Sequence, residues 1–128
     1  MLYRPARVED WPAITELVND SSTYAPADAA VLADGGVWLV AEDDEGVAGC
    51  IWTLMSGRHA FVEYLVVRPD CRNGTGVRLA VYAARQLKKA GVQYVRALTA
   101  NKTVKRMVHS LGGLTEDGYA SAGVYLGE

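Results

Sequence analysis

The stretch from Tyr64 to Gly91 constrains the fold of this chain more than any other part of it. Its residues are YLVVRPDCRNGTGVRLAVYAARQLKKAG, so an apolar strand leads into a short polar loop with two glycines and then into an amphipathic helix. Glycine permits the tight turns that let successive backbone N–H groups, here those from Asn73 to Val77, point at one anion. The positive end of the helix dipole faces the same place. The stretch therefore predicts a site for a ligand that carries phosphate.

Length and charge limit the classes of protein to which the chain can belong. The 128 residues are enough for one core, and we expect a single domain over residues 1–128. Half of the residues are hydrophobic and 22% are charged, as in ordinary globular domains. The net charge of −2 gives no overall attraction to nucleic acid or anionic lipid, so neither is an expected partner.

The sequence predicts no membrane segment, leader or metal site. No apolar run approaches the ~20 residues that span a bilayer, and the first ten residues, MLYRPARVED, lack the apolar core of a signal peptide. Cys50 and Cys71 have neither a metal-binding spacing nor a disulfide framework. We therefore expect a cytoplasmic protein with no metal and no membrane partner.

Hydrophobic periodicity and turn residues predict the order of the elements. The expected strands are 3–7, 37–41, 47–55, 61–67, 92–99 and 119–126, and the expected helices are 11–18, 27–34, 77–90 and 101–111. Consecutive hairpins come first and one strand–helix–strand crossover comes later. We therefore expect an α/β (α+β) fold in the order β-α-(α)-β-β-β-α-β-α-β, with a mixed sheet and helices on both faces.

Two common phosphate-binding loops do not fit the glycine loop. A P-loop ends in Gly-Lys-Ser/Thr, but Gly76 is followed by Val77 and Arg78. A dinucleotide-binding fingerprint needs a third glycine, where this chain has Leu79. It also needs an acidic residue near the end of the next strand, and that strand ends in LTAN.

A third type of loop fits. The segment LVVRP at 65–69, then Arg72, Gly74, Gly76 and a helix of about four turns, resembles the coenzyme A signature of the GNAT superfamily of N-acetyltransferases. That signature is a strand ending L-x-V-x-P, then Arg/Gln-x-x-Gly-x-Gly/Ala, then a helix. The resemblance covers nearly the whole chain, because Asn101 before the helix to 111 matches the family's Asn-led fourth helix. It implies a mostly antiparallel GNAT-like sheet and direct transfer of an acetyl group from acetyl-CoA to a primary amine.

The resemblance also implies which residues contact acetyl-CoA. Backbone N–H groups of the loop hold the pyrophosphate, and backbone groups at the end of the preceding strand pair with the pantetheine amides. Arginine offers a planar fork for phosphate oxygens. The expected cofactor-binding residues are Leu65, Val66, Val67, Arg72, Asn73, Gly74, Thr75, Gly76, Val77 and Asn101. The residues alone leave a plainer alternative: a core strand, a turn before a helix and, at Asn101, a helix cap.

The catalytic candidates are Glu63, His109 and Tyr119. Glu63 is the only ionisable side chain in the apolar run from Ala60 to Val67. It could accept the proton of the attacking amine, because alkylammonium groups have a pKa near ~10.4 and must become neutral to attack. His109 titrates near neutrality, and Tyr119 lies at the expected last strand. The alternatives are a solvent-facing Glu63, a surface His109 and a core or rim Tyr119.

Two positions depart from the family's pattern. Cys71 stands where the family has Arg or Gln, so Arg72 comes one place late. Val108 stands where the family has a tyrosine that protonates the departing thiolate, seven residues after Asn101. Val108 cannot donate a proton, so the thiolate must take its proton from water or from another side chain, with His109, Tyr119 and Tyr125 as the candidates.

The resemblance leaves the acceptor as an amine of a small molecule or of a protein, and it leaves a homodimer open. Val108 also supports a second hypothesis, in which the chain binds coenzyme A with weak or no catalysis and acts as a regulator or inhibitor through protein contacts. The acidic run from Glu42 to Glu45 is expected to form a solvated hairpin turn.

Overall fold

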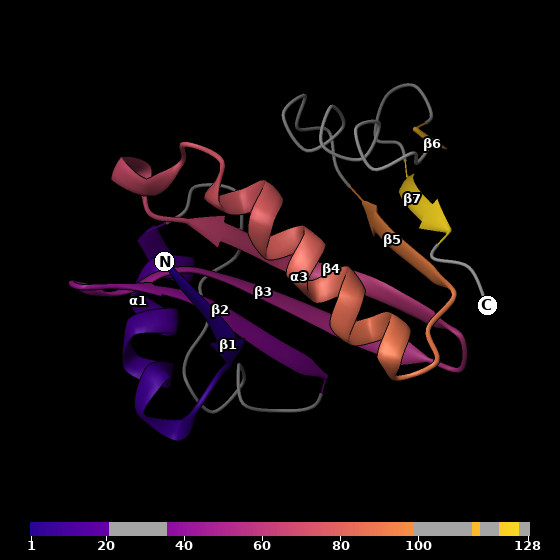
Figure 1. Ribbon diagram of the computed structural model, residues 1–128, viewed down its shortest axis with the longest axis horizontal. Coiled ribbons are helices and arrows are strands. Elements are labelled where there is room, and N and C mark those ends of the chain that lie inside the picture. Colours follow the sequence, from indigo (N-terminus) through magenta and orange to yellow (C-terminus); the bar gives the residue numbers. More distant parts are fainter. Residues whose placement is uncertain (21–35, 99–113, 116–120, 126–128) are drawn as a thin grey trace.

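The computed structural model describes residues 1–20, 36–98, 114–115 and 121–125. Seven strands form one sheet in the order β1-β2-β3-β4-β5-β7-β6 (Figure 1). The strands are β1 (Leu2–Pro5), β2 (Val37–Asp43), β3 (Gly46–Ser56), β4 (His59–Val67), β5 (Tyr94–Leu98), β6 (Leu114–Thr115) and β7 (Ser121–Tyr125). The described helices are α1 (Trp11–Asp20) and α3 (Thr75–Lys89), and short 3-10 turns are η1 (Val8–Asp10) and η2 (Pro69–Cys71).

The sheet is mixed and mostly antiparallel, as expected. Five of the strand pairs are antiparallel, and β4 and β5 form the one parallel pair among the described strands. The α3 helix makes the crossover between those two strands. Of the four helices predicted, those at 27–34 and 101–111 lie outside the described residues. The expected last strand, 119–126, is β7 with a short β6 paired beside it.

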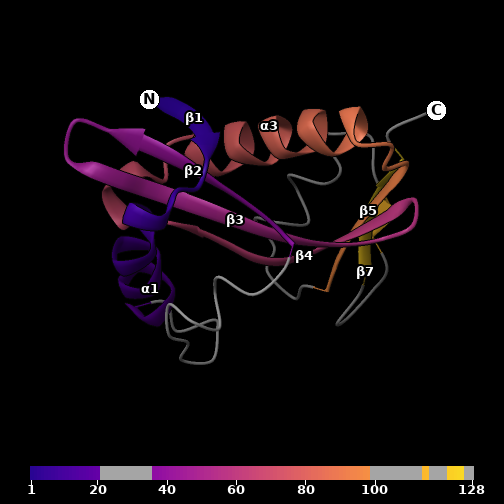
Figure 2. The ribbon, with the colours of Figure 1, turned by 90° about the horizontal axis from the view of Figure 1, so that it is seen from below.

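The two described helices cover opposite faces of the sheet (Figure 2). Ile14 and Val18 of α1 are fully buried against one face, in a cluster completed by Trp38, Val40, Cys50 and Val66. Leu79 and Ala83 of α3 are buried against the other face, with Leu39, Ala41 and Ile51. Because β2 and β3 are covered on both sides, consecutive residues are apolar along them rather than alternating with polar ones.

Aromatic rings form a stack on the α1 face. The rings of Trp38 and Trp52 lie 5.0 Å apart and nearly parallel, and Tyr64 continues the stack 5.4 Å from Trp52. Trp11 of α1 meets Trp38 edge-on at 5.5 Å. Such pairs contribute about 0.5–1.5 kcal/mol each beyond area burial. The stack therefore fixes where α1 sits on the sheet.

A β-bulge interrupts β4 at Glu63. Trp52 pairs with Tyr64 and Thr53 pairs with Val62, so Glu63 has no opposite residue in β3. Val62 packs in the α3 cluster, whereas Tyr64 packs in the α1 cluster, although residues two apart on a regular strand share a face. The bulge thus resets the alternation of β4 at Glu63.

Beside this bulge the parallel ladder ends. The β4–β5 pairing runs from His59↔Tyr94 to Val62↔Ala97, and β4 continues to Val67 paired with β3. The two strands therefore part after Val62 and Ala97. Within the described ranges, no helix is long and apolar enough to cross a membrane.

Candidate functional site

The loop between β4 and α3 has a fixed backbone path. The Arg68 N–H donates to the Ala48 carbonyl at 2.7 Å, which ties the start of the loop to β3. The Cys71 N–H donates to the Arg68 carbonyl at 2.9 Å and the Gly74 N–H donates to the Arg72 carbonyl at 3.0 Å. Gly74 has a φ of 91°, a left-handed conformation that favours glycine. The glycine therefore lets the chain turn directly into α3.

The first turn of α3 offers backbone donors that nothing in the helix uses. Gly74 is the N-cap and provides no side-chain cap, and the Arg78 N–H makes the first helical bond, to the Gly74 carbonyl at 3.1 Å. The N–H groups of Thr75, Gly76 and Val77 consequently have no intrahelical acceptor. No acidic side chain lies in this turn to occupy them. Three donors and the positive helix end thus suit an anion.

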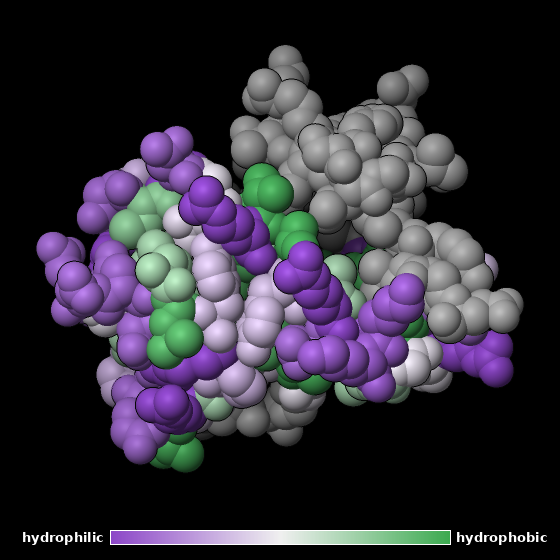
Figure 3. All heavy atoms as spheres, in the orientation of Figure 1, coloured by the Kyte–Doolittle hydropathy of each residue, from purple (hydrophilic) through white to green (hydrophobic). Residues whose placement is uncertain are grey.

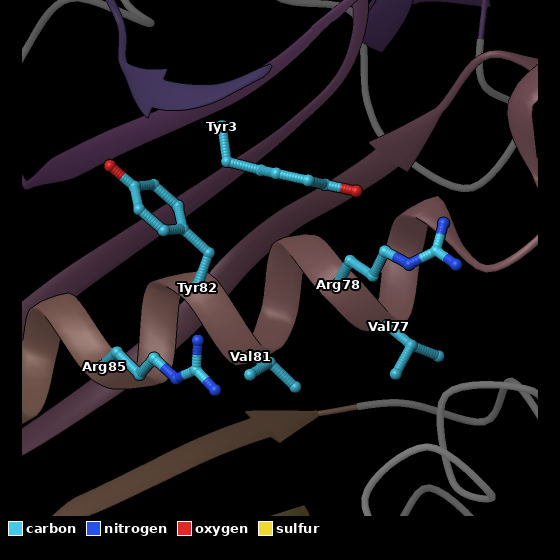
Figure 4. Close-up of a pocket in the computed structure, with 6 residues that line it drawn as sticks. All are labelled: Tyr3, Val77, Arg78, Val81, Tyr82 and Arg85. Atoms are coloured by element: carbon cyan, nitrogen blue, oxygen red, sulfur yellow. The ribbon is translucent and has the colours of Figure 1, made fainter. Parts of the chain in front are cut away.

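Two arginines lie beside these donors. Arg72 donates from Nε to the Val67 carbonyl at 3.2 Å, which holds its guanidinium at the junction of β4 and the loop. The Arg78 guanidinium lies 3.9 Å from the point that a Cβ on Gly74 would occupy. In Figure 4 the Arg78 side chain extends toward the N-terminal end of α3. Both arginines add positive charge where a phosphate would sit.

A shallow hollow of about 350 Å³ continues from this point along the outer side of α3. Its walls are Tyr3, Val77, Arg78, Val81, Tyr82 and Arg85 (Figure 4). The rings of Tyr3 and Tyr82 lie 6.1 Å apart, and Arg78 and Arg85 lie toward the two ends of the hollow (Figure 4). Hydrophilic side chains cover much of the surrounding surface (Figure 3). The hollow is open to solvent and adjoins the loop donors.

A second set of charges holds the loop from the side of the β2–β3 hairpin. Arg68 pairs with Asp43, with Asp70 at 3.0 Å and with Glu45 at 3.8 Å, and it donates to the Cys71 Sγ at 3.1 Å. We call these five residues the Arg68 cluster. Partial burial works against ionisation of Asp43, but the Glu45 N–H and Arg68 outweigh it and hold the pKa of that carboxyl below its usual value.

The prediction of a solvated acidic turn is therefore wrong for two of its residues. Asp43 belongs to the Arg68 cluster, and Glu42 pairs with Arg4 of β1. The error has a physical reason. The partners lie 25 and 38 residues away along the chain, so no local pattern reveals them.

The end of β4 lies against β3 at close range. Val66 and Val67 have buried side chains, so a ligand reaches them through their backbone, as expected. Gly49 of β3 is the neighbour of Val67, and a Cβ on Gly49 would come within 3.1 Å of the Val66 carbonyl. Glycine at this position thus allows β3 and β4 to approach closely at the end of β4, beyond the β4–β5 ladder.

The described residues bring together most of the expected cofactor-binding set. The strand end at 65–67 and the loop residues 72–77 are joined by the short η2 turn, and Thr75 is buried, at 4% exposed. Glu63 is exposed at the bulge, where β4 and β5 part. The candidates Asn101, His109 and Tyr119, like Val108, lie outside the described residues.

Sequence reasoning missed two features of this site. One is Arg68, whose position directly before Pro69 at the end of the strand gave the only signal. The other is the bulge at Glu63, which no residue type marks. In the described part of the chain, no group of three His, Cys, Asp or Glu side chains is placed to hold a metal ion. Burial raises the pKa of the Cys50 thiol to about 12, so this cysteine is not a nucleophile at neutral pH.

Comparison with known proteins agrees with the geometry. Residues 3–112 match the acetyltransferase (GNAT) family. No curated protein gives a significant match to the sequence. The fold resembles that of a phosphinothricin acetyltransferase from Sinorhizobium meliloti in complex with acetyl-CoA, with a TM-score of 0.82 and 20% identity over 99% of this chain and 89% of that one.

Two further solved structures have the same fold. A putative acetyltransferase from Salmonella typhimurium with its cofactor acetyl-CoA has a TM-score of 0.80 and 21% identity over 100% of this chain and 95% of the other. A ribosomal-protein-alanine N-acetyltransferase from Brucella melitensis has a TM-score of 0.78 and 17% identity, covering 98% of this chain and 99% of the other. With the matching family covering nearly all of the sequence, the chain belongs to the acetyltransferase (GNAT) family.

Proposed function

We propose that this protein transfers the acetyl group of acetyl-CoA to a primary amine. The observation that carries the proposal is the set of N–H groups of Thr75, Gly76 and Val77, which have no intrahelical acceptor and lie at the positive end of α3. Arg72 and Arg78 lie beside them. These donors fit a pyrophosphate, and they lie at the end of the strand that parts from β5.

Different residues bind different parts of acetyl-CoA. When bound, acetyl-CoA supplies the acetyl thioester. The loop from Arg72 to Val77 binds the pyrophosphate through backbone N–H groups. The backbone of Val66 and Val67 aligns the pantetheine arm, and Asn101 contacts the same ligand. Positioning of this kind supplies a large part of the rate in a reaction between two bound molecules.

Proton transfer falls to residues around the parting of β4 and β5. The acceptor must lose a proton to attack, and exposed Glu63 takes that proton directly or through water. A C–N bond forms, the C–S bond breaks, and the thiolate needs a proton that Val108 cannot give. His109 and Tyr119 are the proposed donors, with water as the alternative. A cytoplasmic location and a homodimer stay predictions from the sequence.

The first experiment tests the ligand. Gly76 lies in the first turn of α3, so Gly76→Val places a branched side chain among the N–H donors without demanding a left-handed backbone. Calorimetry should show that the variant binds coenzyme A about tenfold more weakly than the wild type, or weaker still. Ala84→Val, two turns further along α3, is the matched control and should bind normally. Equal affinity in folded Gly76→Val would move the site elsewhere.

The second experiment tests catalysis against the regulator hypothesis. Release of free thiol from acetyl-CoA is followed with a panel of primary amines, in the wild type and in Val108→Tyr. We expect slow turnover in the wild type, because loss of one general acid costs about 10²-fold, and faster turnover in the variant. Coenzyme A binding without turnover in either protein would favour a binding module.

The third experiment tests Glu63. At high pH the free amine is already neutral and needs no base, so Glu63→Gln should lower turnover most at low pH. The affinity for coenzyme A should not change. An unaltered pH–rate profile would remove Glu63 from the mechanism.

A further inference from the structure

The face of the sheet opposite α3 carries an open floor at the start of β4 and β5. Val95 packs against Ala60 and Leu87 on the α3 side. The next residue along β5, Arg96, therefore lies on the opposite face. Its neighbour across the parallel ladder is Phe61, just as Tyr94 is the neighbour of His59. We call His59, Phe61, Tyr94 and Arg96 the β4–β5 floor.

Two large hydrophobic side chains of this floor are exposed. Phe61 is 42% exposed and Tyr94 is 40% exposed, although both belong to the sheet. The rings of His59 and Tyr94 stack at 5.0 Å, which makes a flat surface beside Phe61. The α1 helix covers the other end of this face, and β5 lies away from it (Figure 2).

Arg96 differs from Arg4 and Arg68, which form ion pairs with carboxylates. Arg4 and Arg68 each contact at least two carboxylates, whereas Arg96 makes no hydrogen bond or ion pair with another described residue. Its register neighbours are Phe61 on β4 and Gly123 on β7. An exposed arginine beside aromatic rings suits bidentate binding of a carboxylate.

The floor lies next to the expected place of acetyl transfer. The pair Phe61↔Arg96 comes one residue before the last pair of the ladder, Val62↔Ala97, and Glu63 follows at once. Arg96 and Glu63 are thus about two residues, or roughly 7 Å, apart along the strand direction. One small molecule could reach both an anion-binding group and a proton acceptor.

We infer that the β4–β5 floor binds the acceptor, and that the acceptor is an amino acid with an apolar or aromatic side chain. This inference rests on the proposed function. Arg96 binds the carboxylate, Phe61 supports the apolar side chain, and the amine lies toward Glu63. The charge pattern favours this occupant, because a cation and an anion flank an apolar surface as they would flank a dipolar amino acid.

The experiment compares three amines of one shape: phenylalanine, phenylalaninamide and phenethylamine. Wild-type kcat/KM should favour phenylalanine by about tenfold to a hundredfold, the range expected for a charge-assisted pair. Arg96→Gln should abolish this preference, chiefly by lowering kcat/KM for phenylalanine, and Arg96→Lys should keep part of it. Lys88→Gln, which removes an exposed cation from the last turn of α3 on the other side of the sheet, is the matched control.

Several results would overturn the inference. Equal kcat/KM for the three amines, or a preference that survives Arg96→Gln, would remove Arg96 from acceptor binding. Acetylation of peptide N-termini or of other amines, but not of phenylalanine, would refute the amino-acid class and leave the proposed function intact. A dimer in sedimentation equilibrium that Phe61→Asp dissociates would assign the floor to a second copy of the chain. Failure of the wild type to bind coenzyme A would refute the proposed function itself.

Discussion

Arg4 and Arg68 reach neighbouring carboxylates at the end of β2, one from β1 and the other from the loop after β4. Arg4 pairs with Glu42, and Arg68 pairs with Asp43. Each arginine also has a carboxylate close to it in sequence, Asp10 for Arg4 and Asp70 for Arg68. The two groups use the same chemistry, so the difference between them comes from their surroundings.

Burial is that difference. The Arg4 and Asp10 side chains are each 9% exposed, and two parallel hydrogen bonds of 2.7 and 2.9 Å join them. Arg68 is 23% exposed and its partner Asp70 is 64% exposed, so water competes for those contacts. Asp10 also accepts the Arg7 N–H at 2.7 Å, which fixes the turn before α1. The Arg4 group thus holds α1 to the sheet, whereas the Arg68 cluster sets the charge beside the loop between β4 and α3.

The comparison predicts that loss of Arg4 lowers the stability of the fold, and this is the largest of the expected effects. Arg4→Met leaves Asp10 buried without its partner, and breaking such a pair should lower the free energy of unfolding by about 3 kcal/mol. Urea denaturation measures the change. Adding Asp10→Asn to Arg4→Met removes the stranded charge and should restore part of the loss. A loss below about 1 kcal/mol is typical of an exposed pair. Such a loss would mean that burial does not make the Arg4 pair more stabilising than the Arg68 cluster.

The next effect concerns the ligand rather than the fold. Arg68→Gln leaves Asp43 and Asp70 unneutralised beside the loop, so coenzyme A should bind about tenfold more weakly at low salt, as for one lost charge interaction. Stability should change little, because water competes for the contacts of this solvated cluster. Asp43→Asn in the Arg68→Gln background should recover affinity, and calorimetry at two salt concentrations gives both results. Weaker binding of the same size at high salt would argue against this electrostatic account.

Local patterns in the sequence were sufficient for much of this fold. The helix expected at 77–90 is α3, at 75–89, because its apolar stripe and its terminal Lys88 and Lys89 are all close in sequence. The hairpins and the strand–loop–helix unit follow from the same kind of information. The glycine loop was found for the same reason, since its donors come from consecutive residues.

Features that depend on distant contacts could not be predicted in this way. The partners of Glu42 and Asp43 come from other parts of the chain, and an acidic run alone indicates only solvent. The bulge at Glu63 is a property of the pairing between β3 and β4, so in the sequence alone Glu63 looked like an ordinary alternating position. The sequence did not indicate Arg96 as a binding residue, because its position between Phe61 and Gly123 follows only from the register of the sheet.

The smallest effect is a difference in acid sensitivity between Asp10 and Asp43. The hydrogen bond from Arg4 is the main cause that lowers the pKa of Asp10. At Asp43 partial burial opposes the lowering, and the Glu45 N–H and Arg68 outweigh it. A carboxyl whose pKa is lower in the folded than in the unfolded protein stabilises the fold above the unfolded pKa of about 3.9. That contribution is lost as the pH falls through the folded value.

The stability difference between the wild type and Asp10→Asn should therefore be clear at neutral pH and shrink as the pH falls below about 4. Asp43→Asn should show the same sign with a smaller amplitude, because its cluster is open to water. Urea midpoints measured across this range for the two variants, with the wild type as reference, give both amplitudes. If Asp43→Asn removes as much acid sensitivity as Asp10→Asn, burial is not what separates the two groups.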